Sequence, residues 1–196
     1  MSHAASSGGN AGDARGLQGI FRLAVEVQEK TMIPRIAKIA LVAGVAFFLS
    51  LIVFNNLTDF DSNYQFVRHV LMMDSTFQGN HGMWRAIGSP AIHLAFYLGI
   101  IAWEMATAIL LWWGAARMFG ALHSSARNFA AASRLAAYGL TLSLLMWLTA
   151  FLAVGGEWFL MWQSRLWNGQ EAAFRNFALV GLVLLIVSRA EVEMQP

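Results

Sequence analysis

Four apolar runs divide the chain, at residues 36–57, 92–113, 135–154 and 172–187. The first three have the length of about 20 residues or more that an α-helix needs to cross the hydrocarbon core of a bilayer. The fourth is shorter and carries Arg175 and Asn176 in its first turns, so it spans only if the arginine snorkels or the bilayer thins locally. The pattern predicts an all-α membrane protein, a bundle of four transmembrane helices.

The loops after the first and third runs repeat aromatic and aliphatic residues at helical spacing. We expect short amphipathic segments in both loops, lying at the membrane surface. Their rings suit an interfacial aromatic belt, while the length of the first loop favours a docking surface for a partner. That surface would consist of Phe66, Arg68, His69, Trp84, Arg85, Trp158 and Trp162.

Residues 1–31 form an N-terminal extension to the predicted transmembrane domain at 32–196. Residues 1–16 are rich in Ser, Gly and Ala, a composition typical of disorder. Residues 17–30 alternate apolar and charged positions with a helical period, which predicts a short amphipathic helix on the membrane surface. Both Met1 and Met32 suit the start of the natural chain.

Composition and charge agree with a membrane protein. The chain is 58% apolar and 12% charged, whereas a soluble domain is about half apolar and a quarter charged. The basic residues lie beside the apolar runs, so the net charge of +2 indicates no nucleic-acid partner. Nine of the 13 Lys and Arg residues lie on the side of the two termini, and the positive-inside rule therefore predicts that the N- and C-termini are cytoplasmic.

Four short segments together resemble a known family: residues 53–59 (VFNNLTD), 66–71 (FVRHVL), 84–87 (WRAI) and 155–159 (GGEWF). The chain is similar, from about Met32 to Arg189, to the bacterial family of predicted small integral membrane proteins called domain of unknown function 2165. The resemblance implies a multi-pass protein of the bacterial inner membrane with this topology. It carries over no activity and no catalytic residue.

One ionisable residue, Glu104, falls near the centre of the second run, where an unpaired carboxylate costs several kcal/mol. His93, Tyr97 and Glu104 are spaced so that all three share one helix face, which makes an intramembrane polar stripe. Thr141 and Ser143 of the third run match Glu104 in depth and are its expected partners. The stripe suits a proton relay or a polar ligand, and it equally suits a structural hydrogen bond between helices.

A second polar cluster is expected at the outer ends of the helices, from Asn55, Asn56, His93 and Glu157. These residues suit an outward-facing polar site, but helix ends need such groups as caps in any case. No pair of histidines has a recognised metal-ligand spacing and the chain has no cysteine, so we expect neither a metal nor a cofactor.

No nucleophile–base pair, phosphate loop or metal motif is visible, and we therefore expect no enzyme. The interpretation that fits best is an accessory or interaction subunit of a membrane assembly. It would contact the lipid bilayer and either a membrane-protein partner or further copies of itself. Two alternatives stay open: a small proton-coupled transporter or carrier that uses Glu104, and a quinone- or haem-contacting subunit of a respiratory complex.

Overall fold

A computed structural model describes residues 10–191, with side chains from residue 32 onward. All elements in this part of the chain are helices: α1 (Asn10–Thr58), α2 (Phe60–Met72), η1 (His81–Arg85), α3 (Pro90–Gly120), α4 (Ala126–Leu145), η2 (Met146–Trp158), η3 (Met161–Gln163) and α5 (Gln170–Val187). The short elements η1 and η3 are 3₁₀-helices. The longer η2 is a π-helix that continues α4.

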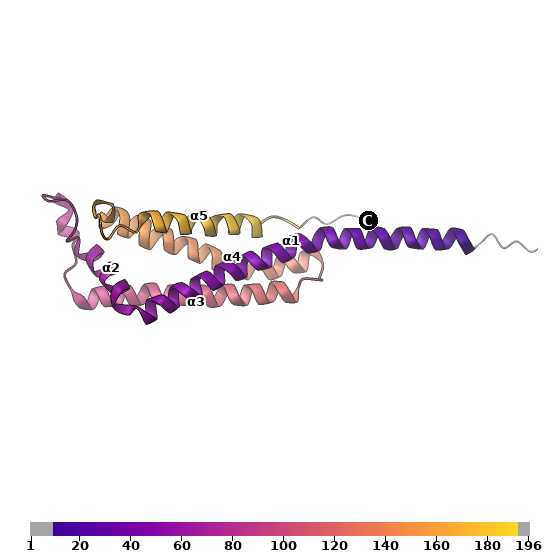
Figure 1. Cartoon of the computed structure of the whole chain (residues 1–196), viewed down its shortest axis with the longest axis horizontal. Coiled ribbons are helices and arrows are strands. Elements are labelled where there is room, and N and C mark those ends of the chain that lie inside the picture. The colour runs from indigo at the N-terminus through magenta and orange to yellow at the C-terminus, as the bar shows by residue number, and fades with distance from the viewer. Residues whose placement is uncertain (1–9, 192–196) are drawn as a thin grey trace, which may run out of the picture.

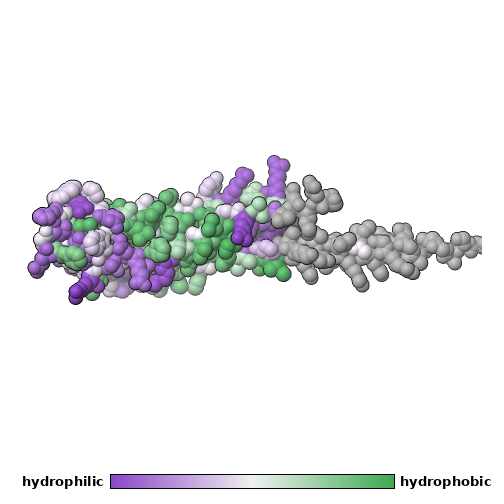
Figure 2. Space-filling view, turned by 90° about the horizontal axis from the view of Figure 1, so that it is seen from above, coloured by the Kyte–Doolittle hydropathy of each residue, from purple (hydrophilic) through white to green (hydrophobic). Residues whose placement is uncertain are grey.

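Four helical stretches are long and apolar enough to cross a membrane: Met32–Thr58, Pro90–Gly120, Ala126–Trp158 and Gln170–Val187. Each one contains one of the four apolar runs, so the predicted fold class is confirmed. The surface has the matching pattern, because an apolar belt lies between hydrophilic ends (Figure 2).

Two spans are longer than their apolar runs. The helix α3 continues to Gly120 and α4 begins at Ala126, so only a short link remains of the long second loop that hydropathy predicts. Arg117, Arg127 and Arg134 lie exposed on these helix ends. Charged residues end an apolar run without ending a helix. Hydropathy alone therefore misplaces the end of α3 and the start of α4.

The N-terminal part of α1 also differs from the prediction. Residues 10–16 are helical where disorder is predicted, and residues 17–30 continue into the span where a separate helix is predicted. Pro34 lies inside α1 and removes a backbone N–H from the helix, yet the helix does not end there. Figure 1 shows this part of α1 extending beyond the bundle. Residues 1–9 lie outside the described part of the chain.

The spans pack in sequence order, α1 on α3, α3 on α4, and α4 with η2 on α5. The closest approach is between α3 and α4, where a Cβ added to Gly114 would lie 2.8 Å from backbone atoms of Ala136. Gly139 is similarly close to Leu111. We call the end that carries α2, η1 and η3 the α2 end, and the opposite end the ion-pair end (Figure 1).

At the ion-pair end, three charged side chains join the start of the first span to the segment that follows α5. Glu191 accepts from Arg35 Nε at 2.9 Å and from Lys38 Nζ at 2.8 Å. Arg35 also donates to the backbone oxygens of Leu122 and Ser124. Burial would raise the pKa of the Glu191 carboxyl, but the hydrogen bonds and charges of Lys38 and Arg35 outweigh burial and lower its pKa.

Candidate functional site

The three residues of the predicted stripe are buried on one face of α3, each no more than 2% exposed. Two of them contact the end of α1. Asn56 Nδ2 donates to Glu104 Oε2 at 2.7 Å, and the hydroxyl of Tyr97 donates to the backbone oxygen of Asn56 at 2.8 Å. His93 lies apart, with Nε2 at 2.7 Å from the backbone oxygen of Ile87.

The partners predicted for Glu104 are wrong. Thr141 is exposed and donates to the backbone oxygen of Ala137 in its own helix. Ser143 is buried, but its hydroxyl has no hydrogen-bond partner among the described residues. The depth estimate failed because it placed the ends of all helices at the same level, whereas α3 extends well past the end of α1.

The register of α1 against α3 explains both the stripe and this error. The two helices run antiparallel, and Asn56 meets Glu104 while Ser50 accepts from Trp112. The end of α1 therefore lies level with the middle of α3, and the first turns of α3 project beyond it, with Tyr97 reaching back to Asn56. There α2 packs against α3, with Val67, Val70 and Leu71 in one apolar cluster with Tyr97 and Ile101.

The predicted outer polar cluster does not assemble. Asn55 and Glu157 are exposed, while His93 bonds to the segment before α3. Of the two asparagines, Asn56 turns inward and Asn55 does not, because adjacent residues of a helix point about 100° apart. This asparagine therefore joins the stripe.

Most residues of the predicted docking surface contact aromatic rings across the two loops. His69 stacks on Trp167 with ring centroids 4.7 Å apart, and Phe66 packs edge-on against the same indole. In a second group, Trp84 packs edge-on against Trp158, and the Arg85 guanidinium lies over both rings.

Trp162 packs against Phe77, and Arg68 donates to Gln65 within α2. With these pairs, the α2–η1 segment and the η3 segment are held to each other. These ring contacts help to close the bundle at the α2 end. Because the rings contact one another, fewer aromatic side chains are unpaired there than the sequence pattern indicates.

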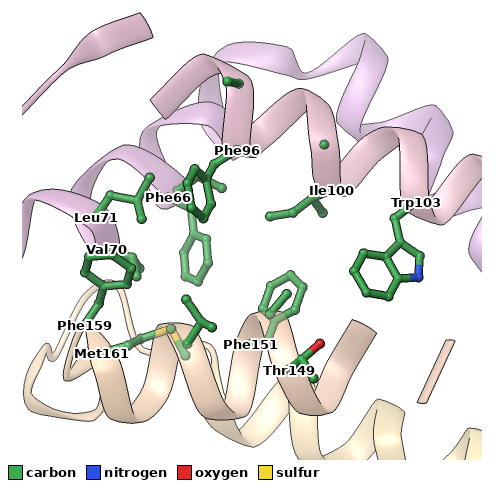
Figure 3. Close-up of a pocket in the computed structure, with 16 residues that line it drawn as sticks. Phe66, Val70, Leu71, Phe96, Ile100, Trp103, Thr149, Phe151, Phe159 and Met161 are labelled. Atoms are coloured by element: carbon green, nitrogen blue, oxygen red, sulfur yellow. The ribbon is translucent and has the colours of Figure 1, made fainter. Parts of the chain in front are cut away.

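An apolar pocket of about 570 Å³ lies between α2, α3 and η2. Figure 3 shows Phe66, Phe96, Ile100 and Phe151 pointing into the space between these elements, with Trp103 at one end. Its walls are almost entirely carbon, and its lining residues are Phe66, Val67, Val70, Leu71, Ala95, Phe96, Gly99, Ile100, Trp103, Thr149, Ala150, Phe151, Val154, Gly155, Phe159 and Met161.

A second pocket of about 470 Å³ adjoins the first, and it contains the polar groups. Glu104, Asn56 and Tyr97 line it together with Trp147 of η2 and Arg175 of α5. The two pockets share four lining residues, Phe66, Val67, Ile100 and Phe151.

The π-helix η2 contributes to both pockets. A π-helix has one more residue per hydrogen-bonded turn than an α-helix. Such segments are rare in proteins, and those that occur often lie at functional sites. Its end is visible in the bond from the amide of Phe159 to the backbone oxygen of Val154. Trp147, near its start, lines the second pocket, and Phe151 lines both.

Sequence reasoning missed three features of this arrangement. Asn56 was assigned to the wrong cluster, and Trp147 and the Arg35–Lys38–Glu191 cluster were not singled out as sites. A signal for the ion cluster was present, because Lys38 interrupts an apolar run and Glu191 follows the last one closely. No charged interruption of an apolar run marks Trp147 in the same way. Within residues 32–191 no group of three potential metal ligands comes together.

Comparisons with curated proteins and with solved structures found no match. A family described as "Predicted small integral membrane protein (DUF2165)" matches residues 34–190. The match covers all four spans, the ion cluster as far as Arg189, and both pockets. The chain therefore belongs to the DUF2165 family of predicted small integral membrane proteins.

Proposed function

We propose that this protein binds a lipophilic molecule within the membrane, as a non-enzymatic accessory subunit of a membrane assembly. The observation that carries the proposal is the apolar pocket between α2, α3 and η2. Its volume of about 570 Å³ is typical of pockets that hold small ligands, which measure roughly 300–1,000 Å³.

The pocket opens toward the lipid. Phe96 and Gly99 on α3 and Val154 on η2 are exposed, and all three belong to membrane spans. A lipophilic molecule can therefore enter sideways from the bilayer without crossing water. The opposite wall is formed by buried residues of α2, Val67 and Leu71.

The shape favours a small molecule over a partner helix. Along α3 the lining runs from Ala95 to Trp103, which is about 12 Å of helix. A partner that crosses the membrane would need a groove about 30 Å long. The pocket is also closed at the α2 end by Phe159 and Met161 (Figure 3).

Gly99 offers a direct test. It lines the pocket, and a Cβ added there would meet nothing within 4 Å, so Gly99→Phe fills the pocket without a clash at its base. Gly44 is a matched control: it is an exposed glycine of a span with equally open surroundings, and it lines neither pocket.

The measurement is mass spectrometry of the lipophilic molecules that stay bound after purification in mild detergent. We expect wild type and Gly44→Phe to retain a defined molecule and Gly99→Phe to lose it. Equal retention by Gly99→Phe and wild type, or no bound molecule in wild type, would refute the proposal.

The accessory role rests on the sequence, which shows no phosphate loop or metal motif, and within residues 32–191 no group of three potential metal ligands comes together. We place the protein in the bacterial inner membrane, with the ion-pair end and both termini facing the cytoplasm, because the basic residues concentrate there. Pull-down in mild detergent followed by mass spectrometry tests for a partner. Recovery of the chain alone would contradict the accessory role.

One observation favours the carrier as a second candidate: Glu104, a carboxyl group in a span, lines a pocket. A proton-coupled carrier should acidify or alkalinise the lumen of liposomes that contain only this protein. Glu104→Gln should abolish that activity. Purified protein that moves no protons in either direction would exclude the carrier.

A further inference from the structure

We infer that the two adjoining pockets form one site for an amphipathic molecule whose hydroxyl-bearing head group lies between Glu104 and Trp147. The inference rests on the proposed function and specifies its ligand. The apolar body would occupy the pocket between α2, α3 and η2, and the head group the pocket beside it.

Trp147 provides the first independent observation. It is 5% exposed and lines the second pocket, and its indole Nε1 is buried without a hydrogen-bond partner among the described residues. An indole N–H can only donate, and leaving such a group unpaired in an apolar interior costs stability. A ligand oxygen in this pocket would accept that hydrogen bond.

Glu104 provides the complementary group. Only its Oε2 accepts from Asn56, at 2.7 Å, and the carboxyl group lines the same pocket as Trp147. A carboxyl group has more acceptor sites than the amide of Asn56 fills. The pocket therefore presents an N–H that needs an acceptor and oxygens that can take a donor. A hydroxyl group supplies both from one atom.

The residues that line both pockets connect the two parts of the proposed site. Phe66, Val67, Ile100 and Phe151 line both pockets, and beyond them the first pocket is carbon-lined while the second carries the polar groups. A molecule that lies across these residues keeps its chain among carbon atoms and its oxygen beside Glu104 and Trp147. A long-chain alcohol, a monoacylglycerol and a prenylated quinol all have this chemistry.

The test uses the full chain in phosphatidylcholine nanodiscs and two photoactivatable probes. One is a diazirine-bearing hexadecanol, and the other is its methyl ether, which has the same chain but cannot donate a hydrogen bond. We expect the alcohol to label peptides that line both pockets, and the ether to label them roughly tenfold less, since the net contribution of one good hydrogen bond is about one such factor.

Variants then assign the head-group contacts. Trp147→Phe keeps the ring and removes only the N–H, so it should reduce the preference for the alcohol severalfold. Glu104→Gln should also reduce it. The matched control is Trp113→Phe, the same change at an exposed residue of α3 outside both pockets. That control should leave the preference unchanged.

The outcomes separate this inference from the proposed function. If both probes label wild type equally and Gly99→Phe blocks both, a lipophilic molecule binds but the head-group site is wrong. If neither probe labels the pockets of wild type, both fail. Where the preference holds, competition by a monoacylglycerol and by a short-chain quinol identifies which source of the hydroxyl group is bound.

Discussion

Replacing Glu191 by glutamine removes the negative charge that Arg35 and Lys38 share at the ion-pair end. The three side chains are 8–10% exposed, so water compensates the loss poorly. Glutamine keeps the shape and one acceptor oxygen. The change therefore isolates the charge from the packing.

The expected loss follows from what the two cations keep. Removing one partner of a buried ion pair costs about 3–5 kcal/mol when the other charge is left alone. Here Arg35 keeps the backbone oxygens of Leu122 and Ser124, and Lys38 keeps that of Arg189. The cost thus falls to that of the weakened charge-assisted hydrogen bonds, about 1.5–3 kcal/mol of unfolding free energy. For a chain of this size it corresponds to a melting temperature lower by about 3–12 °C.

The pH dependence supplies an independent check. The pKa of Glu191 is lowered in the folded protein, while an unfolded glutamate has a pKa of about 4.3. The stabilisation by the carboxylate is therefore fully present above about pH 4.3 and is lost as the pH falls through the lower, folded value. Wild type should lose stability from this group only below that pH, and Glu191→Gln should lack this loss.

The assay is thermal unfolding in detergent micelles, followed by tryptophan fluorescence between pH 3 and 7. The control is Glu157→Gln, the same change at an exposed carboxyl group, which should shift the free energy by no more than about 0.5 kcal/mol. A Glu191→Gln variant as stable as this control, or with the acid dependence of wild type, would refute the reasoning.

Further predictions concern the stripe, the topology and the N-terminus. Glu104→Leu should destabilise the bundle by about 1 kcal/mol in thermal unfolding, because it removes the interhelical hydrogen bond from Asn56, whereas Glu104→Gln should keep the fold. Reporter fusions after Pro196 should be active as cytoplasmic fusions and those within residues 61–88 as periplasmic ones; the reverse would overturn the orientation. Deleting residues 1–16 should leave expression and melting temperature nearly unchanged, and a large loss of either would show that they support the bundle.

The four spans could be predicted from the sequence because hydropathy over about 20 residues reflects a requirement that each helix meets by itself. Pairing between helices is a different matter. The contact between Asn56 and Glu104 depends on how far α1 is shifted along α3, and no residue within either helix encodes that shift. It results from α2, whose apolar face packs on the first turns of α3.

The second pocket was beyond sequence reasoning for a related reason. Trp147 is the single tryptophan of the third apolar run and follows Ser143 by four residues, so the usual helical period puts both on one face. Which groups that face meets depends on how α4 and η2 pack against α3 and α5, and the pattern of one helix does not contain that information. The π-helix then changes the angular step from Met146 to Trp158, so the usual period misplaces the later residues of this run.

The register also fixes the distance between Glu104 and the ion cluster. Arg35 bonds to the backbone oxygen of Leu122, which fixes the level of the ion cluster beside the end of α3. From Leu122 to Glu104 is about 27 Å of helix, and the hydrocarbon core is about 30 Å thick. Glu104 and the ion cluster are therefore separated along α3 by nearly the thickness of the core.

This separation favours a head-group site over a relay across the membrane. Between Glu104 and the ion cluster, the buried polar side chains among the described residues are the hydroxyls of Thr107, Ser133 and Ser143. Thr107 and Ser133 donate to backbone oxygens of their own helices, as hydroxyls in apolar spans commonly do. A proton relay would need titratable groups or a water-filled path along this distance, whereas an amphipathic ligand needs polar partners only where its head group lies. Glu104 and Trp147 line one pocket and meet that need there, and the carbon-lined pocket beside them holds the rest of such a molecule.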